Sequence, residues 1–418
     1  MRRALVLAAV ACLVAGCTPD DGGGGNAVRV QVSGEPEETA VYKAVANAFA
    51  KSHPNIDVEV IEVADKDDHL AKLTTSFAGG NPPDVFLINY REYSQFVTRG
   101  AIEPVGDFLE DGGVSLDDYF PQPIEAFTYD GELQCMPQNI SSLVVYYNRT
   151  LFADAGLKPP RAGWSWEDFR RTALALTAGD VRGLGIEPNI IRLAPFVWSN
   201  GGEIVDDPDA PSRFTLESPE AREAIEFIVS LVRDDEVVPT ETEVTAQDLE
   251  TRFVSGKVGM LLTSRRETPE FREVLGLDWD VGPLPVADDP AGILHSDAYC
   301  IAHDSEVHAD AFEFVKFATG KEGETVAAFG GRTVPSLIDV ANSGAFLDPS
   351  QPPSHSKVFL DGIPAIRRTP VIPTWPEIED LAQEIFTRMF YEDGYTIEDA
   401  LSDLDDQATP LFEEGSAP

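Results

Sequence analysis

Hydrophobic residues between positions 28 and 88 switch repeatedly between the spacing of a strand and that of a helix. Alternating or continuous apolar residues predict strands, and apolar residues three and four positions apart predict helices. The predicted strands cover 28–32, 56–60 and 84–88, and the predicted helices between them cover 41–49 and 70–78. This order of elements indicates an α/β fold with a parallel sheet.

The same kinds of element return after Pro137. Strands are predicted at 143–147 and 258–262, and helices at 166–176, 221–232, 309–319 and 378–390, with one more opening at 396. Ser165 and Asp168 have the spacing of a capping box. We therefore predict two α/β lobes. Open parallel sheets bind ligands beyond the carboxyl ends of their strands, where Glu35 and residues 89–91 would lie.

Length and charge restrict the class of protein. The chain has 418 residues, too many for one ordinary domain, and its hydrophobic content of 43% is enough for substantial cores. It carries 31 basic and 72 acidic residues, a formal net charge of −41. Nucleic-acid binding and docking on anionic lipid headgroups both need a basic surface, so this charge argues against both.

The N-terminal sequence MRRALVLAAVACLVAGC predicts export. Two arginines precede an apolar run that is too short to span a membrane, which is the pattern of a signal peptide. Leu13 to Cys17 (LVAGC) resembles the bacterial lipobox, in which the cysteine is lipidated. We predict a lipoprotein signal peptide at 1–16 and a lipidated Cys17 with a Gly-rich tether over 17–27. The alternative is an ordinary signal peptide with a chance cysteine.

Cys135 and Cys300 remain once Cys12 leaves with the signal peptide and Cys17 takes the lipid. Two remaining cysteines in an exported protein favour a disulfide. The alternative is a pair of small buried hydrophobic side chains.

The sequence carries no recognisable motif of an enzyme or a metal site. It contains no Gly-x-Ser-x-Gly, no Gly-x-x-x-x-Gly-Lys-Ser/Thr and no His-Glu-x-x-His. Its 72 acidic residues form many carboxylate pairs by chance, so a glycosidase pair cannot be argued from them. We predict no enzymatic activity, no cofactor and no metal.

Eight stretches of the chain carry a resemblance to a known family. They are NAFAKSHPNIDVEV, LTTSFAGGNPPDVFLIN, the segment from CMPQNISS to FRRTALALT, VWSNGGEI, FVSGKVGMLLTS, WDVGPLPV, AYCIAHDSEVHADAFEFVKFATG and GGRTVPS. In this order they resemble the extracellular solute-binding proteins of sugar-type ABC importers (family 1), which include maltose-binding protein. The resemblance extends from about residue 28 to about residue 400.

The resemblance implies a two-lobe periplasmic-binding-protein fold of type II, each lobe being a mostly parallel sheet flanked by helices. The N-terminal lobe would comprise 28–138 plus 300–345, and the C-terminal lobe 139–299 plus 346–418. Strands that cross between the lobes are expected near 138–141, 296–299 and 345–355. Cys135 and Cys300 would then flank two neighbouring crossings, which favours the disulfide further.

A ligand would bind in the cleft between the lobes. A sugar presents an apolar face and a ring of hydroxyls, so its site combines aromatic rings with carboxylate, amide and arginine groups. Residues of these types at expected cleft positions are Glu35, Asn89, Tyr90, Arg91, Asn139, Ser141, Trp198, Asn200, Arg265, Asp297, Tyr299, Arg332 and Trp375. We expect Trp375, which lies between two prolines, to stack on the ligand. The alternatives are a helix cap for Asn89, a solvated charge for Arg91 and a core position for Trp198.

The resemblance implies a monomeric, lipid-anchored subunit at the extracellular face of the membrane of a Gram-positive-type bacterium. It would capture a mono- to oligosaccharide and deliver it to the transmembrane permease subunits of an ABC importer. Because Arg91, Arg265 and Arg332 are positively charged, an anionic cargo such as a glycerol phosphodiester remains an alternative. A polyol is a further alternative. A secreted carbohydrate-active enzyme is the alternative from another class.

Overall fold

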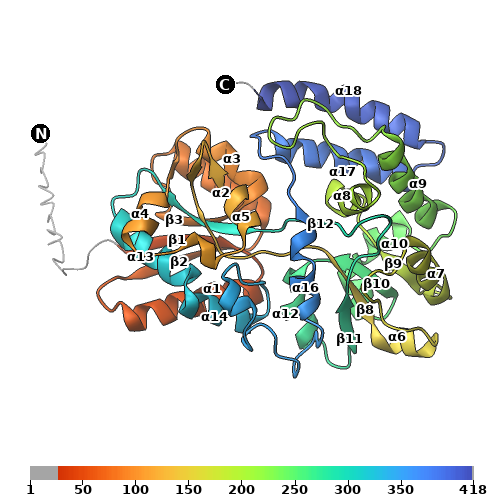
Figure 1. Ribbon diagram of the computed structural model, residues 1–418, viewed down its shortest axis with the longest axis horizontal. Helices are drawn as coiled ribbons and strands as arrows, with labels where there is room; N and C mark the ends of the chain where they lie inside the picture. The colour runs from red at the N-terminus through yellow and green to blue at the C-terminus, as the bar shows by residue number, and fades with distance from the viewer. Residues whose placement is uncertain (1–26, 417–418) are drawn as a thin grey trace, which may run out of the picture.

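The computed structural model describes residues 27–416, which form two lobes side by side (Figure 1). The N-terminal lobe contains a six-stranded sheet with the order β2-β1-β3-β13-β4, in which β7 also pairs with β13. Its strands are β1 (Val28–Ser33), β2 (Val58–Val63), β3 (Val85–Asn89), β4 (Ile102–Glu103), β7 (Met136–Pro137) and β13 (Asp297–Ala302). The first three predicted strands are therefore present, the second shifted towards its C-terminus.

Helices pack on both sides of this sheet. The longest, α1 (Pro36–Ser52), buries Val41, Val45 and Phe49, which are helically spaced as the sequence predicted. The other helices of this lobe are α2 (Lys66–Ala78), α3 (Tyr90–Val97), α4 (Gly106–Asp111), η1 (Leu116–Asp118), α5 (Pro121–Ala126), α13 (His308–Thr319), α14 (Lys321–Gly330) and α15 (Ile338–Ala341). A small hairpin joins β5 (Thr128–Tyr129) to β6 (Glu132–Leu133).

The C-terminal lobe is built on a four-stranded sheet with the order β11-β8-β10-β9. Its strands are β8 (Val144–Asn148), β9 (Arg182–Gly185), β10 (Val258–Thr263) and β11 (Trp279–Gly282). Its helices are α6 (Arg149–Asp154), α7 (Trp166–Leu176), α8 (Ile190–Ser199), α9 (Pro219–Arg233), α10 (Glu241–Ala246), α11 (Leu249–Val254), η2 (Arg265–Glu267), α12 (Thr268–Glu273), α17 (Trp375–Tyr391) and α18 (Ile397–Gly415). The capping box of Ser165 and Asp168 begins α7 as predicted.

The α/β binding-protein fold is as predicted, but the sheets are less parallel than expected. In the N-terminal lobe β1, β2 and β3 are parallel, whereas β13 is antiparallel to all its partners. In the C-terminal lobe β8 is antiparallel to both neighbours, and only β9 and β10 are parallel. The reason is the connectivity: β8 and β13 enter their sheets from the opposite lobe, so no crossover helix sets their direction.

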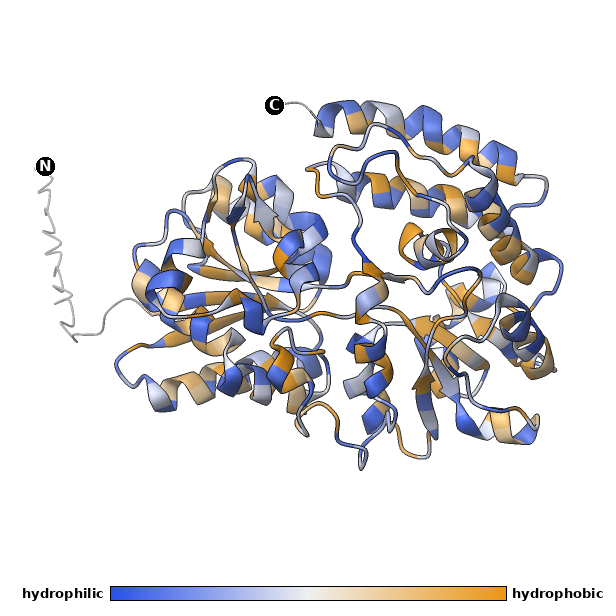
Figure 2. Ribbon diagram, in the orientation of Figure 1, coloured by the Kyte–Doolittle hydropathy of each residue, from blue (hydrophilic) through white to orange (hydrophobic). Residues whose placement is uncertain are grey.

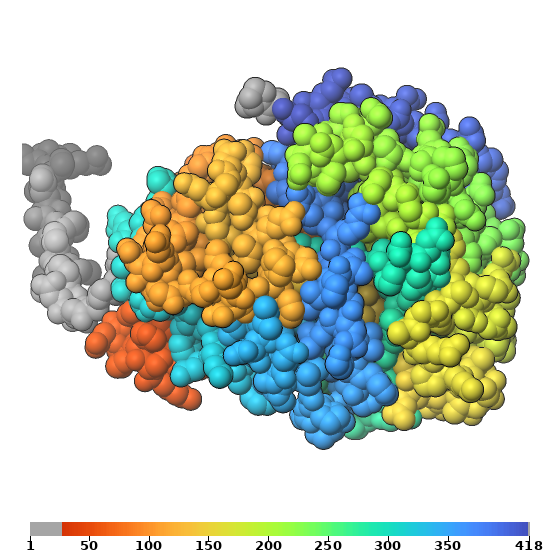
Figure 3. Space-filling model, viewed as in Figure 1, coloured from red at the N-terminus to blue at the C-terminus, as the bar shows by residue number. Residues whose placement is uncertain are grey.

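Three connections join the lobes. The first runs from β7 to β8, and the second from β12 (Gly292–Ile293) to β13. The third contains α16 (Lys357–Asp361), η3 (Ile363–Ala365) and β14 (Ile366–Arg367), and β14 pairs with β12. Figure 3 shows the third connection running over the junction of the lobes on the face in view.

Strand β8 divides the buried side chains between two cores. Val144 and Tyr146 belong to a core that continues into the N-terminal lobe, whereas Val145 and Tyr147 belong to the core beneath α8, α9, α17 and α18. This division follows from the two-residue period of a strand. Hydrophobic residues accordingly concentrate on the strands of both sheets in Figure 2, while the surrounding helices carry hydrophilic residues as well.

Cys135 and Cys300 form a disulfide, with an S–S distance of 1.98 Å. Cys135 precedes β7 and Cys300 lies in β13, and these two strands are neighbours in the sheet. The bond therefore joins the chain just before the first connection to the chain just after the second. Of the two alternatives for these cysteines, a disulfide or two buried free side chains, the disulfide is confirmed.

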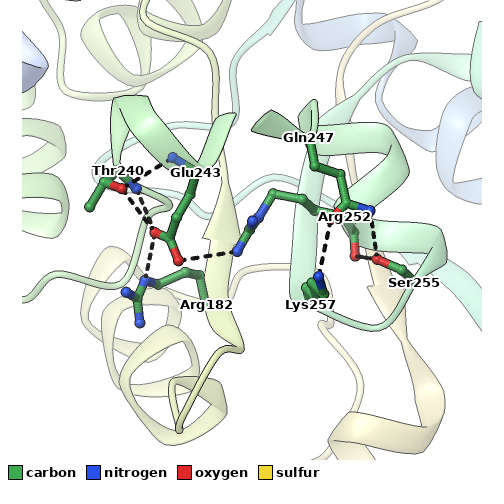
Figure 4. A network of polar contacts seen from close by, with 7 residues as sticks. All are labelled: Arg182, Thr240, Glu243, Gln247, Arg252, Ser255 and Lys257. Carbon is green, nitrogen blue, oxygen red and sulfur yellow. Dashed lines mark hydrogen bonds and ion pairs between the residues drawn. The ribbon is translucent and has the colours of Figure 1, made fainter. Parts of the chain in front are cut away.

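An ion-pair network lies at one end of the C-terminal sheet (Figure 4). Glu243 pairs with Arg182, at the start of β9, at 3.4 Å and with Arg252 at 3.3 Å. The same carboxylate completes a capping box with Thr240 at the start of α10. Because Arg182 starts its strand, this network lies opposite the strand ends that face the other lobe, and we assign it to stability.

Candidate ligand-binding site

The carboxyl end of β3 carries the first part of the candidate site. Asn89 caps α3 by accepting a hydrogen bond from the Arg91 backbone N–H at 3.2 Å. Its Nδ2 also donates to Asp297 Oδ1 at 3.0 Å, because the two residues are paired in register across β3 and β13. Asn89 thus has the capping role considered above, and it also orients a carboxylate.

Arg332 joins this group from the loop after α14. Its Nε lies 2.9 Å from Glu38 Oε1, and its Nη1 lies 3.8 Å from Asp297 Oδ2. Asn139 donates from Nδ2 to the same Asp297 oxygen at 3.3 Å. Arg332 therefore faces two carboxylates, which balance its positive charge.

The C-terminal lobe contributes a second charged group. Glu187 follows β9 and lies 2.7 Å from Arg192 of α8, whose positive charge lowers the pKa of the Glu187 carboxyl. Arg266, which follows β10, lies 2.5 Å from Glu267. The side chains of Glu187 and Arg266 are 38% and 59% exposed, so both face open space and not the core.

His295 lies on the second connection between the lobes, after β12 and before β13. Burial lowers the pKa of its imidazole well below the usual range, and the positive charges of Arg91, Arg192 and Arg266 lower it further. The ring is therefore neutral at physiological pH. Its Nε2 atom is buried and has no hydrogen-bond partner within residues 27–416, so it is available to a ligand group.

An ion pair that involves Arg91 connects the two lobes directly. Arg91 Nε of the N-terminal lobe lies 3.4 Å from Glu379 Oε1 on α17 of the C-terminal lobe. The Trp375 indole donates from Nε1 to the same Glu379 oxygen at 2.7 Å. Burial raises the pKa of the Glu379 carboxyl, and the charge of Arg91 opposes the rise.

The structure brings together five of the residues predicted from the sequence and places a sixth beside them. The five are Asn89, Arg91, Asn139, Asp297 and Arg332. Ser141 is the sixth: it follows Asn139 by two positions, and its backbone pairs with that of His295.

Other predicted residues have packing or surface positions. Arg265 is 1% exposed and donates to the Gly331 carbonyl at 2.7 Å and to Ser356 Oγ at 3.1 Å. Burial lowers the pKa of this arginine to about 9. Tyr90 is buried and hydrogen-bonds Thr369, and Tyr299 is buried against Phe314. Glu35 is exposed at the N-cap of α1, and Asn200 bonds the start of α9.

The two tryptophans expected at the ligand are buried in this arrangement of the lobes. Trp375 is 0% exposed and packs near Phe214 and Phe412. Trp198 is 5% exposed, and the guanidinium of Arg367 lies 4.8 Å from its ring centre. In this structure neither ring has a face that is open for a ligand to stack on.

The sequence analysis did not single out five charged or titratable residues of the candidate site, namely Glu187, Arg192, Arg266, His295 and Glu379. We refer to these five residues together with Glu38, Asn89, Arg91, Asn139, Asp297 and Arg332 as the charged cluster. A signal was present for Glu187, because a charged residue directly follows a short strand at the edge where ligands bind. No such signal existed for Glu379, which lies one turn inside a helix.

A separate groove of about 780 Å³ lies beside the third connection. Arg368 in its wall pairs with Glu125 of the N-terminal lobe and with Asp209 of the C-terminal lobe. None of the residues that line this groove belongs to the charged cluster.

The described part of the chain shows neither a metal site nor a membrane-spanning helix. Within residues 27–416, no group of three or more His, Cys, Asp or Glu side chains could hold a metal ion. No helix in the same range is both long and apolar enough to cross a membrane.

The chain belongs to the family of bacterial extracellular solute-binding proteins, whose sequences match residues 33–325. It is therefore a substrate-binding protein of an ABC importer, and not an enzyme.

Individual relatives agree over nearly the whole chain. A binding protein of Brucella abortus is 27% identical over 406 residues, which cover 94% of each chain. The solved structure of an ABC substrate-binding protein, Lmo0181 from Listeria monocytogenes, in complex with cycloalternan, is 25% identical with a TM-score of 0.85. It covers 92% of this chain and 98% of its own. UgpB from Mycobacterium tuberculosis, in complex with glycerophosphocholine, is 19% identical with a TM-score of 0.82, covering 94% and 99%.

Proposed function

We propose that this protein captures a neutral carbohydrate, from a mono- to an oligosaccharide, between its lobes and delivers it to the permease subunits of an ABC importer. The observation that carries the proposal is the buried Nε2 atom of His295, which has no hydrogen-bond partner within residues 27–416 and lies on a connection between the lobes. The positive charges of Arg91 from the N-terminal lobe and of Arg192 and Arg266 from the C-terminal lobe all act on this ring. A ligand held there would contact both lobes and stabilise their closed arrangement.

The pairing of charges favours a polyhydroxylated ligand over an anion. Each arginine of the cluster has a carboxylate beside it: Arg91 has Glu379, Arg192 has Glu187, Arg266 has Glu267, and Arg332 has Glu38. A hydroxyl can donate to a carboxylate and accept from a guanidinium, so alternating groups of the two kinds match a sugar. A phosphate would gain from the arginines but would be repelled by the carboxylates.

The Listeria relative, whose structure contains cycloalternan, supports a carbohydrate as the cargo. The similarity to UgpB from Mycobacterium tuberculosis, whose structure contains glycerophosphocholine, is a similarity of fold alone. A glycerol phosphodiester is therefore the comparison ligand in the test.

The test is a thermal-shift screen of the purified protein against mono- and oligosaccharides, polyols and glycerophosphocholine, followed by calorimetry of each hit. A ligand at 100 times its Kd stabilises the folded protein by about 2.7 kcal/mol, which is easily measured. Glu187→Gln should weaken a sugar at least tenfold, because it removes a charged acceptor. Glu226→Gln, an exposed position on α9, is the matched control.

Preferential binding of glycerophosphocholine would replace the sugar proposal with the anionic alternative. Chemical conversion of any ligand by the purified protein would contradict a binding function.

The lipid anchor at Cys17 is also part of the proposal, although Cys17 lies outside the residues that the structure describes. The LVAGC sequence supports it. In cells, Cys17→Ser should move the protein from the membrane fraction to the soluble or secreted fraction. If the variant fractionates like the wild type, the anchor assignment is wrong.

A further inference from the structure

The Arg91–Glu379 ion pair is a direct contact between the lobes that needs no ligand. Arg91 lies in the first turn of α3, and Glu379 lies in the second turn of α17. The side chains are 12% and 19% exposed, so the pair is shielded from solvent much more than an ordinary surface ion pair. Any rotation that separates α3 from α17 must break it.

Both side chains are held in place from within their own lobes. The α3 cap by Asn89 fixes the backbone of Arg91, and the Tyr90 ring lies 5.7 Å from its guanidinium. The buried Trp375 donates to Glu379, which fixes the carboxylate on α17. The contact therefore joins two ordered groups and costs little side-chain entropy when it forms.

Arg91 also retains hydrogen-bonding capacity. Its Nε and Nη1 atoms are buried and make no hydrogen bond within residues 27–416, since Nε reaches Glu379 at ion-pair distance only. The same guanidinium acts on the His295 ring. Arg91 thus pairs with Glu379, and its charge also acts on His295.

We propose that Glu379 is a positioning residue: from the C-terminal lobe it holds Arg91 of the N-terminal lobe, and so it links closure of the lobes to the orientation of an arginine at the ligand site. The ion pair maintains a population of closed molecules before the ligand arrives. Apparent affinity rises with the fraction of molecules that is already competent to bind. Only this effect on affinity rests on the proposed ligand site.

The experiment measures lobe closure without ligand and uses purified protein. Small-angle X-ray scattering would give the radius of gyration of the wild type, Glu379→Gln, Arg91→Gln and the double variant. Glu379→Gln keeps an oxygen that can accept the hydrogen bond from the Trp375 indole, and it removes the negative charge. Glu384→Gln, an exposed position on the same helix, is the matched control.

Either single substitution should increase the ligand-free radius of gyration, and the double variant should increase it no further, because both remove one interaction. The melting temperature of each variant tests folding separately. One folded variant is enough to show whether the ion pair keeps the lobes closed without ligand. Equal radii for the wild type and a folded variant would overturn the proposal.

Once a ligand is known, Glu379→Gln should raise its Kd roughly tenfold, a typical size for coupling between two states. An unchanged Kd in a variant that scatters as a more open protein would overturn the link to the ligand site. A screen that finds no ligand would bear on the proposed function and would leave the scattering result intact.

Discussion

Asn139 and Asp297 hold the first two lobe connections together by a reciprocal pair of hydrogen bonds. The Asp297 backbone N–H donates to Asn139 Oδ1 at 2.6 Å, and Asn139 Nδ2 donates to Asp297 Oδ2 at 3.3 Å. One residue precedes β8 and the other begins β13, so the bonds join the strand that leaves the N-terminal lobe to the strand that returns to it.

Replacing Asn139 should therefore destabilise the protein. Asn139 is 6% exposed, and Asn139→Ala would leave a buried N–H and part of a carboxylate unpaired. Such losses cost about 2–3 kcal/mol of unfolding free energy. Urea denaturation would measure the loss. Asn342→Ala, at an exposed helix end, should change it by less than about 0.5 kcal/mol, and equal effects of the two substitutions would show that the reciprocal bonds are unimportant.

The disulfide should stabilise the same region. Cys135 and Cys300 are 165 positions apart, and closing a loop of this length restricts the unfolded chain strongly. Replacing both by Ser should lower the unfolding free energy by about 2–5 kcal/mol. A chain that begins after Cys17, so that Cys135 and Cys300 are its only cysteines, should show no thiol reactivity when denatured without reductant; two reactive thiols per chain would contradict the bond.

Glu324 is predicted to carry a proton in the folded state. Its side chain is 0% exposed, and its Oε1 lies 2.8 Å from Ser336 Oγ, which lies 2.7 Å from the Pro137 carbonyl. A serine has one hydroxyl proton, so a protonated Glu324 that donates to Ser336, which donates to Pro137, satisfies both contacts. Burial raises the pKa of this carboxyl well above its usual range.

The raised pKa of Glu324 has a definite consequence for stability. Below about pH 4.5 the group is protonated in both states and costs nothing, whereas at higher pH the unfolded chain loses the proton first. Folding is then penalised by up to about 1.4 kcal/mol per pH unit until the folded pKa is reached. Glu324→Gln should therefore be more stable than the wild type at pH 7–8, and the difference should vanish towards pH 4.

Urea denaturation of Glu324→Gln as a function of pH tests this sign. The exposed Glu322→Gln on the same helix is the control. A variant that is less stable than the wild type at neutral pH would indicate an ionised Glu324.

The sequence predicted the local elements well because their causes are local. The capping box of Ser165 and the alternation of residues 28–32 each specify one element by themselves, and both are found. Trp375 shows where local reasoning went wrong. The sequence suggested a loop between prolines, but Trp375 is the first residue of α17, and Pro376 lies in the first turn, where proline is commonly found. The tryptophan side chain is fully buried.

The site was predicted only in part, because its other members come together through tertiary contacts. Asn89 could be expected at the end of a strand, and Asp297 at a crossing between the lobes that the family resemblance implies. That Glu379 meets Arg91 depends on how α17 packs beside α3, which no periodicity reveals. The aromatic rings expected at the ligand are buried, whereas arginines of both lobes that are paired with carboxylates act electrostatically on His295.

Calorimetric titration of a sugar hit into the wild type and Glu187→Gln, with Glu226→Gln as the control, tests the central claim most directly. The account predicts saturable 1:1 binding without chemical conversion. It further predicts that binding weakens at least tenfold in Glu187→Gln and is unchanged in the control. Equal affinity in all three proteins would contradict a ligand site at the charged cluster between the lobes.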